Sequence, residues 1–242
     1  MEPELSRSSL NGSALVALLA ELALIDGPAA APSFVQGLGR WLGWEDAIHL
    51  SAALQAPDAS SPGVMSPMRA RQQAQQVQQL QAEGGRLRTA LGRKLEEDGS
   101  QAGDTDFAHY RRHYTACQQA MADAIGPLRS QARAAVARVS PPLQRLAAMD
   151  EVMDQALGSH EQGLLAQLPT LLERHFTRLR RAQEGTPAAS GSAAWLDTFR
   201  QDMRRIGRAE LALRLLPLQG LLDTLQALPL LPPLQTQAIK DS

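Results

Sequence analysis

Apolar residues recur at intervals of three and four along most of this 242-residue chain, and this spacing constrains the fold more than any other feature. Such a repeat places one residue per turn on the same face of an α-helix. The longest example is a heptad-like stripe that needs a facing helix: Val77, Leu80, Gly84, Leu87, Leu91 and Leu95. A second stripe comprises Phe107, Tyr110, Tyr114, Cys117, Met121 and Ala124. No segment of the sequence alternates apolar and polar residues as a half-buried strand would. The sequence therefore predicts an all-α protein.

The amino-acid composition also favours a fold in which long helices pack side by side. Hydrophobic residues make up 44% of the chain and aromatic residues only 4%. Most of the hydrophobic residues are Ala and Leu, which are strong helix formers, whereas β-branched and aromatic residues favour strands. We expect a small N-terminal helical unit followed by an elongated helical bundle with coiled-coil-like hairpins and small side chains at the contacts.

Proline and glycine mark the predicted boundaries along the chain. The segments PDASSPGVMSP and EGTPAASGS are typical of flexible linkers. We therefore expect an N-terminal helical unit, a linker, a long-helix bundle, a second linker, and C-terminal helices with a tail, at residues 1–56, 57–67, 68–183, 184–192 and 193–242. Within the bundle, Gly158-Ser159 is expected to break a helix striped by Leu143, Leu146, Met149, Met153 and Leu157. Pro217 is expected to end the helix that begins near Trp195.

The block from Phe34 to Leu54 holds two of the three tryptophans of the chain. One interpretation is a small core, in which a helix carrying Trp41 meets Ile48, Leu50 and Leu54 of the next helix and packs on the first. The other is a docking surface, because Trp and Arg are frequent at binding hot spots. The candidate docking residues are Arg40, Trp41, Trp44, Glu45 and Asp46. We assign Trp41 to the core and leave Trp44 open, with Glu45 or Asp46 expected to cap the second helix.

The segment HYRRHYTAC is the basis of an alternative functional hypothesis, a metal site. His109, His113 and Cys117 are spaced four and four, so they lie on adjacent turns of a helix, and His with Cys can bind zinc. The heptad register argues against a metal site, because it directs Cys117 into the helix interface and His109 to solvent. The alternative function is a metal-binding sensor or enzyme built on these three residues. The preferred interpretation is a buried thiol beside two surface imidazoles, with no cofactor.

Arginine clusters offer a second alternative, a nucleic-acid-associated regulator. They comprise Arg174, Arg178, Arg180 and Arg181 in one helix and Arg200, Arg204, Arg205 and Arg208 in another. These side chains can bind phosphates, but the aromatic interleaving of single-strand binders is absent and the net charge is −1. We therefore favour solvated helix faces and expect no nucleic-acid partner.

The apolar run from Ser13 to Ile25 is too short and too acidic in its surroundings to predict a signal peptide or a membrane span, since Glu21 interrupts it and Glu2 and Glu4 precede it. A single cysteine excludes a disulfide scaffold. No catalytic motif is recognisable, and His175 is expected to be a partly buried residue with local hydrogen bonds. We expect a soluble cytoplasmic protein that is not an enzyme.

Three segments together carry a family resemblance: GRWLGWEDAIHLSAAL, LLAQLPTLLERHF and AELALRLLPLQGLLDTL, at residues 39–54, 164–176 and 209–225. The chain resembles an uncharacterised, all-helical family of proteobacterial proteins, found mainly in Burkholderia relatives and classed as a domain of unknown function. The resemblance implies no established activity. Its members are often encoded near membrane proteins of the ion-driven motor or OmpA-like type, which implies a cytoplasmic accessory to an envelope assembly.

These observations lead to one preferred hypothesis. The protein is expected to be a non-enzymatic, cytoplasmic helical scaffold or adaptor with a protein partner, which the resemblance implies is a component of a membrane complex. Extended apolar stripes also favour self-association as a homo-oligomer.

Overall fold

The computed structural model describes residues 14–25, 43–55, 67–97, 106–184 and 194–227. Within these ranges the chain forms helices and turns and no strand, which confirms the all-α prediction. The helices are α1 (Ala14–Glu21), α3 (Trp44–Gln55), α4 (Pro67–Glu96), α5 (Phe107–Ala137), α6 (Pro141–Leu165), α7 (Leu168–Glu184) and α8 (Ala194–Gln226). The two predicted linkers lie outside the described ranges except at their edges, where Pro67 and Glu184 are already helical.

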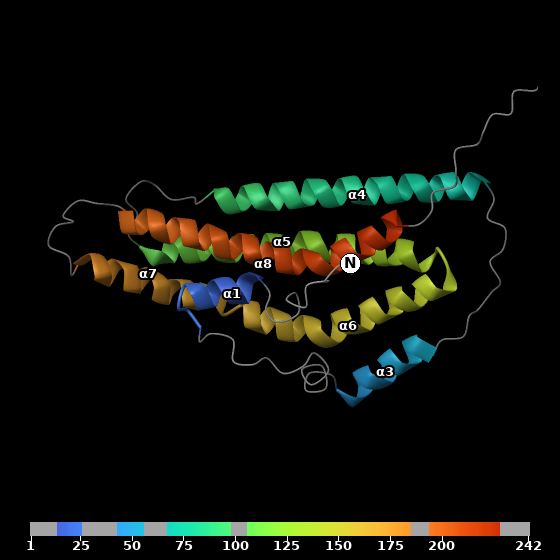
Figure 1. The fold of residues 1–242 in the computed structure, drawn as a ribbon, viewed down its shortest axis with the longest axis horizontal. Helices are drawn as coiled ribbons and strands as arrows, with labels where there is room; N and C mark the ends of the chain where they lie inside the picture. The colour runs from blue at the N-terminus through green and yellow to red at the C-terminus, as the bar shows by residue number, and fades with distance from the viewer. Residues whose placement is uncertain (1–13, 26–42, 56–66, 98–105, 185–193, 228–242) are drawn as a thin grey trace, which may run out of the picture.

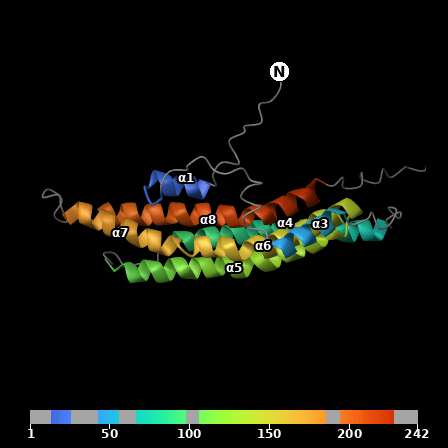
Figure 2. The same ribbon diagram turned by 90° about the horizontal axis from the view of Figure 1, so that it is seen from below.

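Helix α5 lies at the centre of an elongated bundle. It packs against α4, α6, α7 and α8. Helix α8 in turn contacts α4 and α7, so the last helix of the described chain lies between elements from both halves of the sequence. The long helices run side by side along the molecule, as Figures 1 and 2 show from two directions. The expected elongated bundle is therefore the arrangement found.

The two stripes identified in the sequence form the contacts of α4 and α5. In α4, Val77, Leu80, Leu91 and Leu95 are buried. In α5, the buried residues include Tyr110, Tyr114, Cys117 and Met121. Asp106 begins α5, because its carboxylate accepts a hydrogen bond from the Ala108 N–H at 2.9 Å and so satisfies a donor that the helix leaves open. Spacing at three and four residues therefore correctly predicts which faces of these helices are covered.

Helices α4 and α8 approach closely at two glycines. A Cβ atom on Gly207 of α8 would lie 2.7 Å from Leu95 Cδ2 of α4. A Cβ atom on Gly84 of α4 would lie 2.9 Å from Leu222 Cδ1 of α8. The pairs 95 with 207 and 84 with 222 show that the two helices run antiparallel. The absence of a side chain at Gly84 and Gly207 allows a leucine of the facing helix to occupy that space.

Buried apolar side chains form two clusters along the length of the bundle. The first joins α4, α5 from Cys117 to its C-terminal end, α6 at Ala147 and the C-terminal half of α8, and includes Leu80, Met121 and Leu218. The second joins α1, α7, the start of α5 and the start of α8, and includes Phe176 and Phe199. Most of the few aromatic residues of the chain meet in the second cluster, where the Phe176 and Phe199 ring centroids lie 5.0 Å apart.

Two expected helix ends are absent. Helix α6 continues through Gly158 and Ser159 to Leu165, and α8 continues through Pro217 to Gln226. Both predictions are wrong. Proline removes one helical hydrogen bond and crowds the preceding turn, but buried leucines lie on both sides of Pro217 in α8, at Leu215, Leu218 and Leu221. Tertiary packing thus holds the helix together across a residue that would end an isolated one.

The described helices of the predicted unit 1–56 contact different parts of the bundle. Helix α1 buries Leu15, Leu18 and Leu19 in the second cluster and packs on α8. Helix α3 packs on α6, at a distance from α1 in both ribbon views (Figures 1 and 2). These two helices therefore pack on the bundle separately, α1 on α8 and α3 on α6.

Candidate functional site

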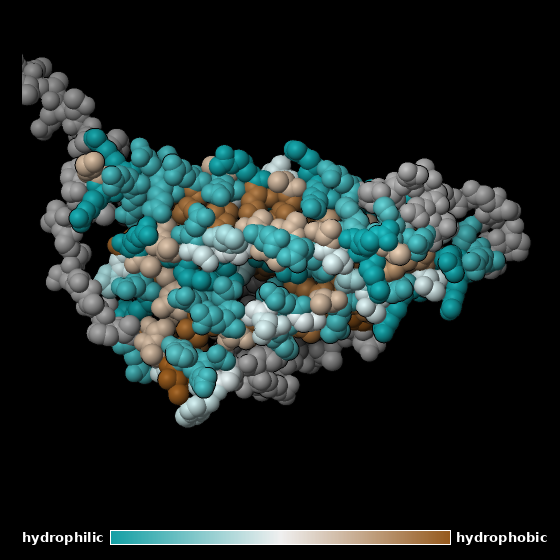
Figure 3. All heavy atoms as spheres, turned by 180° about the vertical axis from the view of Figure 1, so that it is seen from behind, coloured by the Kyte–Doolittle hydropathy of each residue, from teal (hydrophilic) through white to brown (hydrophobic). Residues whose placement is uncertain are grey.

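Helix α3 leaves its largest apolar side chains exposed to solvent. Its only partly buried residues are Asp46, Leu50 and Ala53, whose spacing of four and three puts them on one face. On the other side, Trp44 is 82% exposed, Ile48 is 52% exposed and Leu54 is 55% exposed. In the space-filling view, apolar atoms lie at the lower left end of the molecule, where α3 is (Figure 3). We call the exposed set Trp44, Ile48 and Leu54 the α3 outer face.

Hydrogen bonds at the N-terminus of α3 stabilise the first turn of this helix, which carries Trp44 of the outer face. The Asp46 carboxylate accepts a hydrogen bond from the Gly43 N–H at 3.0 Å, and the Gly43 carbonyl accepts one from the Ala47 N–H. This is one half of a capping box, in which a side chain in the first turn reaches back to the residue before the helix. The prediction that Glu45 or Asp46 caps this helix is confirmed for Asp46. Trp44, which directly follows Gly43, is thereby fixed on the first turn.

The structure brings together three of the five predicted docking residues. Trp44, Glu45 and Asp46 lie in the first turn of α3, with Trp44 and Glu45 exposed and Asp46 partly buried. Arg40 and Trp41 lie outside the described residues. The interpretation of Ile48 and Leu54 as parts of a small core is wrong, because more than half of each side chain is exposed. The sequence could not show this, since the choice of covered face depends on where α6 lies.

Helix α6, on which α3 packs, is also covered less than its sequence predicts. Only Ala147 and Leu165 are buried among its 25 residues, and Leu146 and Leu164 are exposed. The expected core stripe of leucines and methionines is partly accessible throughout, at Leu143, Leu146, Met149, Met153 and Leu157. Methionine side chains adapt to partners of different shape. Helices α3 and α6 therefore form the least covered apolar region among the described helices.

A network of two arginines and two aspartates joins α6 to α5. Arg129 binds Asp150 at 2.7 Å and Asp154 at 2.6 Å, and Arg133 binds the same two carboxylates at 2.8 and 2.7 Å. All four residues are at least partly buried. The sequence carries a signal for this network: the arginines and the aspartates are each spaced by four, which places each pair on one helix face. This network joins α6 to α5 along the face that also carries Leu143 and Leu157, each seven residues from Asp150.

The predicted metal ligands are only partly brought together. His113 Nε2 lies 3.5 Å from Cys117 Sγ, and Cys117 is buried as expected. The expectation that His109 points to solvent is wrong, since its ring is half-buried and lies edge-on to Tyr110. Burial raises the pKa of the Cys117 thiol, which favours the protonated form over the thiolate that binds metals. In the described residues, no group of three or more His, Cys, Asp or Glu side chains could hold a metal ion.

His175 and Asp202 form a buried pair that resembles the orienting half of a catalytic triad. His175 Nε2 lies 2.8 Å from Asp202, and the Arg178 guanidinium lies 2.9 Å from His175 Nδ1. Because a guanidinium only donates, Nδ1 is the acceptor and Nε2 donates to Asp202. Both ring nitrogens are therefore engaged, and the residue is 2% exposed. The sequence predicted a partly buried histidine with local hydrogen bonds. His175 is instead fully buried, and only its contact with Arg178 is local, since Asp202 lies on α8. No ring nitrogen is left for a substrate.

The same group of side chains attaches α1 to the bundle. Arg178 also donates to the Leu22 carbonyl at 2.7 Å and to the Ala23 carbonyl at 3.3 Å. Arg205 of α8 binds Glu21 at 2.9 Å. These contacts satisfy carbonyl groups that the end of a helix leaves open and place cations beside its negative end.

A second buried polar group centres on Glu210 of α8, which is fully buried. Its carboxylate accepts hydrogen bonds from the Tyr114 hydroxyl at 2.7 Å, the Gln118 amide at 3.0 Å and the Arg214 guanidinium at 2.7 Å. Burial, with the charge of Glu210, raises the pKa of Tyr114 well above its usual value. The network satisfies a charge that would otherwise be costly inside the bundle. The sequence signal was an acidic residue within the apolar run AELALRLL.

The predicted arginine clusters do not form one basic surface. Arg178 and Arg205 are engaged at α1, and Arg180 pairs with Glu184 of its own helix. Arg208 pairs with Glu96 of α4. Arg178, Arg205 and Arg208 therefore join helices. Arg200, Arg204 and Arg208 line one pocket, and Arg205 and Arg208 also line a second pocket beside α1.

These features define an all-helical protein whose buried polar groups are mutually engaged and whose least covered apolar surface lies on α3 and α6. The chain belongs to a family of proteins of unknown function, DUF3348, which it matches over residues 1–227. No curated protein and no solved structure matches it. Among the described helices, none is long and apolar enough to cross a membrane.

Proposed function

We propose that this protein is a non-enzymatic helical adaptor that binds a partner protein through the α3 outer face. The observation that carries the proposal is the exposure of Trp44, Ile48 and Leu54 on one side of a helix whose other side rests on α6. Large apolar side chains gathered on an exposed face are typical of interaction sites. Tryptophan in particular contributes strongly to binding energy when a partner buries it.

The shape of the outer face favours a helical partner. Trp44 and Ile48 are one turn apart on the same side, and Leu54, six residues further on, lies about 120° round the helix from Ile48, at the edge of this face. An amphipathic helix laid along α3 would cover this stripe with residues spaced by three and four. The accessible leucines and methionines of α6 provide further apolar surface on the helix beneath.

The charge of α3 favours a basic partner. Glu45 and Asp46 are the acidic residues of this helix, and it carries no Lys or Arg. Basic residues beside the apolar stripe of the partner would meet Glu45 and fix the direction of docking. We therefore infer that the partner presents a basic amphipathic helix. On the family resemblance, we extend the proposal to a cytoplasmic role beside an envelope or ion-driven membrane assembly.

The buried polar groups support an adaptor over an enzyme. Both ring nitrogens of His175 are occupied, and burial favours the protonated form of the Cys117 thiol. The Glu210 carboxylate is fully buried and engaged by three partners. Each of these groups joins helices. Such contacts are expected in a rigid protein that presents a binding surface.

The test compares two substitutions of exposed apolar residues. Ile48→Glu places a charge in the α3 outer face, and Leu216→Glu does the same on α8, where Leu216 is equally accessible. Full-length protein carrying each change is used to recover partners from cells that express the gene, and the basic amphipathic helices of the proteins recovered are synthesised as peptides. We expect a peptide that binds the unchanged protein and Leu216→Glu alike but binds Ile48→Glu at least about tenfold more weakly.

A second measurement checks the charge argument. Neutralising the basic residues of the bound peptide should weaken binding and reduce its dependence on salt concentration. Equal binding of the peptide to Ile48→Glu and to the unchanged protein would refute docking on α3. Binding that depends on Leu216 instead would move the adaptor surface to α8.

A further inference from the structure

A polar pocket lies between the first turns of α8 and the C-terminal end of α4. It has a volume of about 500 Å³ and is lined by Glu96, Asp197, Arg200, Gln201, Arg204 and Arg208. Cavities of this size accommodate small molecules. The pocket is at the opposite end of the bundle from α3 (Figure 1), so it is a feature separate from the proposed docking surface.

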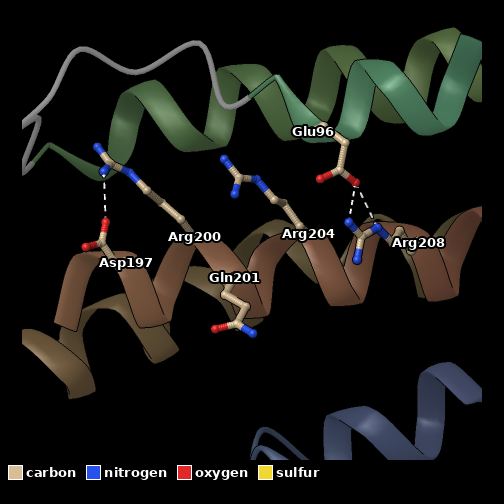
Figure 4. Close-up of a pocket in the computed structure, with 6 residues that line it drawn as sticks. All are labelled: Glu96, Asp197, Arg200, Gln201, Arg204 and Arg208. Carbon is tan, nitrogen blue, oxygen red and sulfur yellow. Dashed lines mark hydrogen bonds and ion pairs between the residues drawn. The ribbon is translucent and has the colours of Figure 1, made fainter. Parts of the chain in front are cut away.

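Three arginines share one face of α8 in this pocket. Arg200, Arg204 and Arg208 are spaced by four, and all three extend toward the neighbouring helices while Glu96 of α4 points toward them (Figure 4). Successive residues at this spacing lie one turn apart. A ligand in the pocket would therefore meet guanidinium groups from three consecutive turns.

Neighbouring side chains hold two of these arginines in position. Arg200 Nε donates to the Tyr110 hydroxyl at 3.2 Å, and its side chain is only 14% exposed. Arg208 Nε donates to Glu96 at 2.8 Å. Guanidinium groups fixed before a ligand arrives lose little conformational freedom on binding it.

The charge of the pocket favours an anion. Its three arginines outnumber its two carboxylates, Glu96 and Asp197. Asp197 is 71% exposed and lies 3.3 Å from Arg200, and Glu96 is also well exposed. Exposed ion pairs of this kind are weak. A multiply charged anion can therefore displace Asp197 from Arg200 at small cost.

We propose that this pocket binds a small molecule carrying a phosphate or diphosphate group. The planar fork of a guanidinium matches two oxygens of such a group, and several arginines around one ligand neutralise its charge. This ligand site goes beyond the adaptor function and does not depend on it. Binding there would tie α8 to the end of α4 and so strengthen the contact between these helices.

The experiment is calorimetric titration of the full-length protein with inorganic pyrophosphate and with inorganic phosphate at low ionic strength. We expect a single site that binds pyrophosphate more tightly than phosphate. Arg204→Gln should weaken binding about tenfold, and Arg204→Lys should weaken it less, because the charge remains while the fork is lost. The control is Arg86→Gln, an exposed arginine of α4 outside the pocket, which should change affinity by less than about twofold.

A gain of affinity provides an independent check. Asp197→Asn removes a competing carboxylate from an exposed position and should tighten pyrophosphate binding by about two- to fivefold. Thermal melting of each variant establishes that it is folded. Failure of the unchanged protein to bind pyrophosphate, an equal loss in Arg86→Gln and Arg204→Gln, or no gain in Asp197→Asn would each overturn the site.

The same titration distinguishes the sources of phosphate. Vesicles containing phosphatidic acid are compared with vesicles of phosphatidylcholine, and a short single-stranded oligonucleotide is tested in parallel. Binding of free pyrophosphate together with phosphatidic acid vesicles would identify a lipid headgroup as a source. Binding only to the oligonucleotide would contradict a small-molecule site and favour nucleic acid.

Discussion

Helices α3 and α8 use similar residues in opposite ways. Helix α8 buries apolar side chains along its whole length, from Leu196 to Leu225, and contacts α1, α4, α5 and α7. Helix α3 has no buried residue and packs on α6. Aromatic residues show the contrast most clearly, since Phe199 is fully buried and Trp44 is 82% exposed. The difference separates residues that hold the bundle together from apolar residues that remain exposed.

The largest effect should come from the aromatic centre of α8. Phe199 contacts the rings of Phe176 and Tyr110 at centroid distances of 5.0 and 5.2 Å. Phe199→Ala removes these contacts and leaves a cavity, so we expect a loss of about 3–5 kcal/mol in the free energy of unfolding. Urea denaturation followed by circular dichroism measures it. A loss below about 1 kcal/mol would mean that the second cluster is not close-packed.

A smaller effect should arise where α8 meets α4. Gly207→Ala would bring a methyl group to 2.7 Å from Leu95 Cδ2, and we expect it to cost about 1–3 kcal/mol in the free energy of unfolding. Gly220→Ala is the matched control in the same helix, because nothing lies within 4 Å of its Cβ position. That change should instead stabilise the protein by about 0.5–1 kcal/mol, because alanine favours helix. Stabilisation by both substitutions would show that α4 and α8 are farther apart at Gly207 than the distance of 2.7 Å implies.

The contact between α8 and α5 should make the protein sensitive to alkaline pH. Burial beside Glu210 raises the pKa of Tyr114 above its ordinary value of 10.0. Above that pH the unfolded chain releases the proton while the folded protein retains it. The free energy of unfolding therefore falls as pH rises, by at most about 1.4 kcal/mol per pH unit for this group. Denaturation measured between pH 9 and 11 should show a shallower decline in Tyr114→Phe.

The smallest effect on stability should come from α3. Because the outer face lies in solvent, Trp44→Ala should change the free energy of unfolding by no more than about 0.5 kcal/mol. The same substitution should weaken binding of the partner helix strongly, as expected for a hot-spot tryptophan. Urea denaturation and peptide titration of one preparation measure both quantities. A large loss of stability would show that Trp44 belongs to the core and would remove the contrast with α8.

The contrast also shows which features could be read from the sequence. The stripes of α4 and α5 were predictable because the spacing of Val77, Leu80, Leu91 and Leu95 is a local property of one helix. The continuation of α8 through Pro217 was not, because it depends on leucines that pack against α4 and α5. Local signals determine that a helix forms, whereas its neighbours determine where it ends.

The candidate sites follow the same division. The composition of α3 indicated a site around Trp44, but which face is exposed depends on α6. The bond between Tyr114 and Glu210 joins residues 96 positions apart, and no short motif records it. The acidic residue within an apolar run predicted only that Glu210 needs a partner.

The attachment of α1 to α8 has a consequence for folding during synthesis of the protein. Glu21 binds Arg205, 184 residues further along the chain. At ordinary rates of translation of about 5–20 residues per second, Glu21 is synthesised roughly 10–40 s before that arginine. The first of the described helices therefore waits for α8, and its leucines lack the cover of that helix meanwhile. Chaperones that shield nascent apolar segments have their longest opportunity to act at this helix.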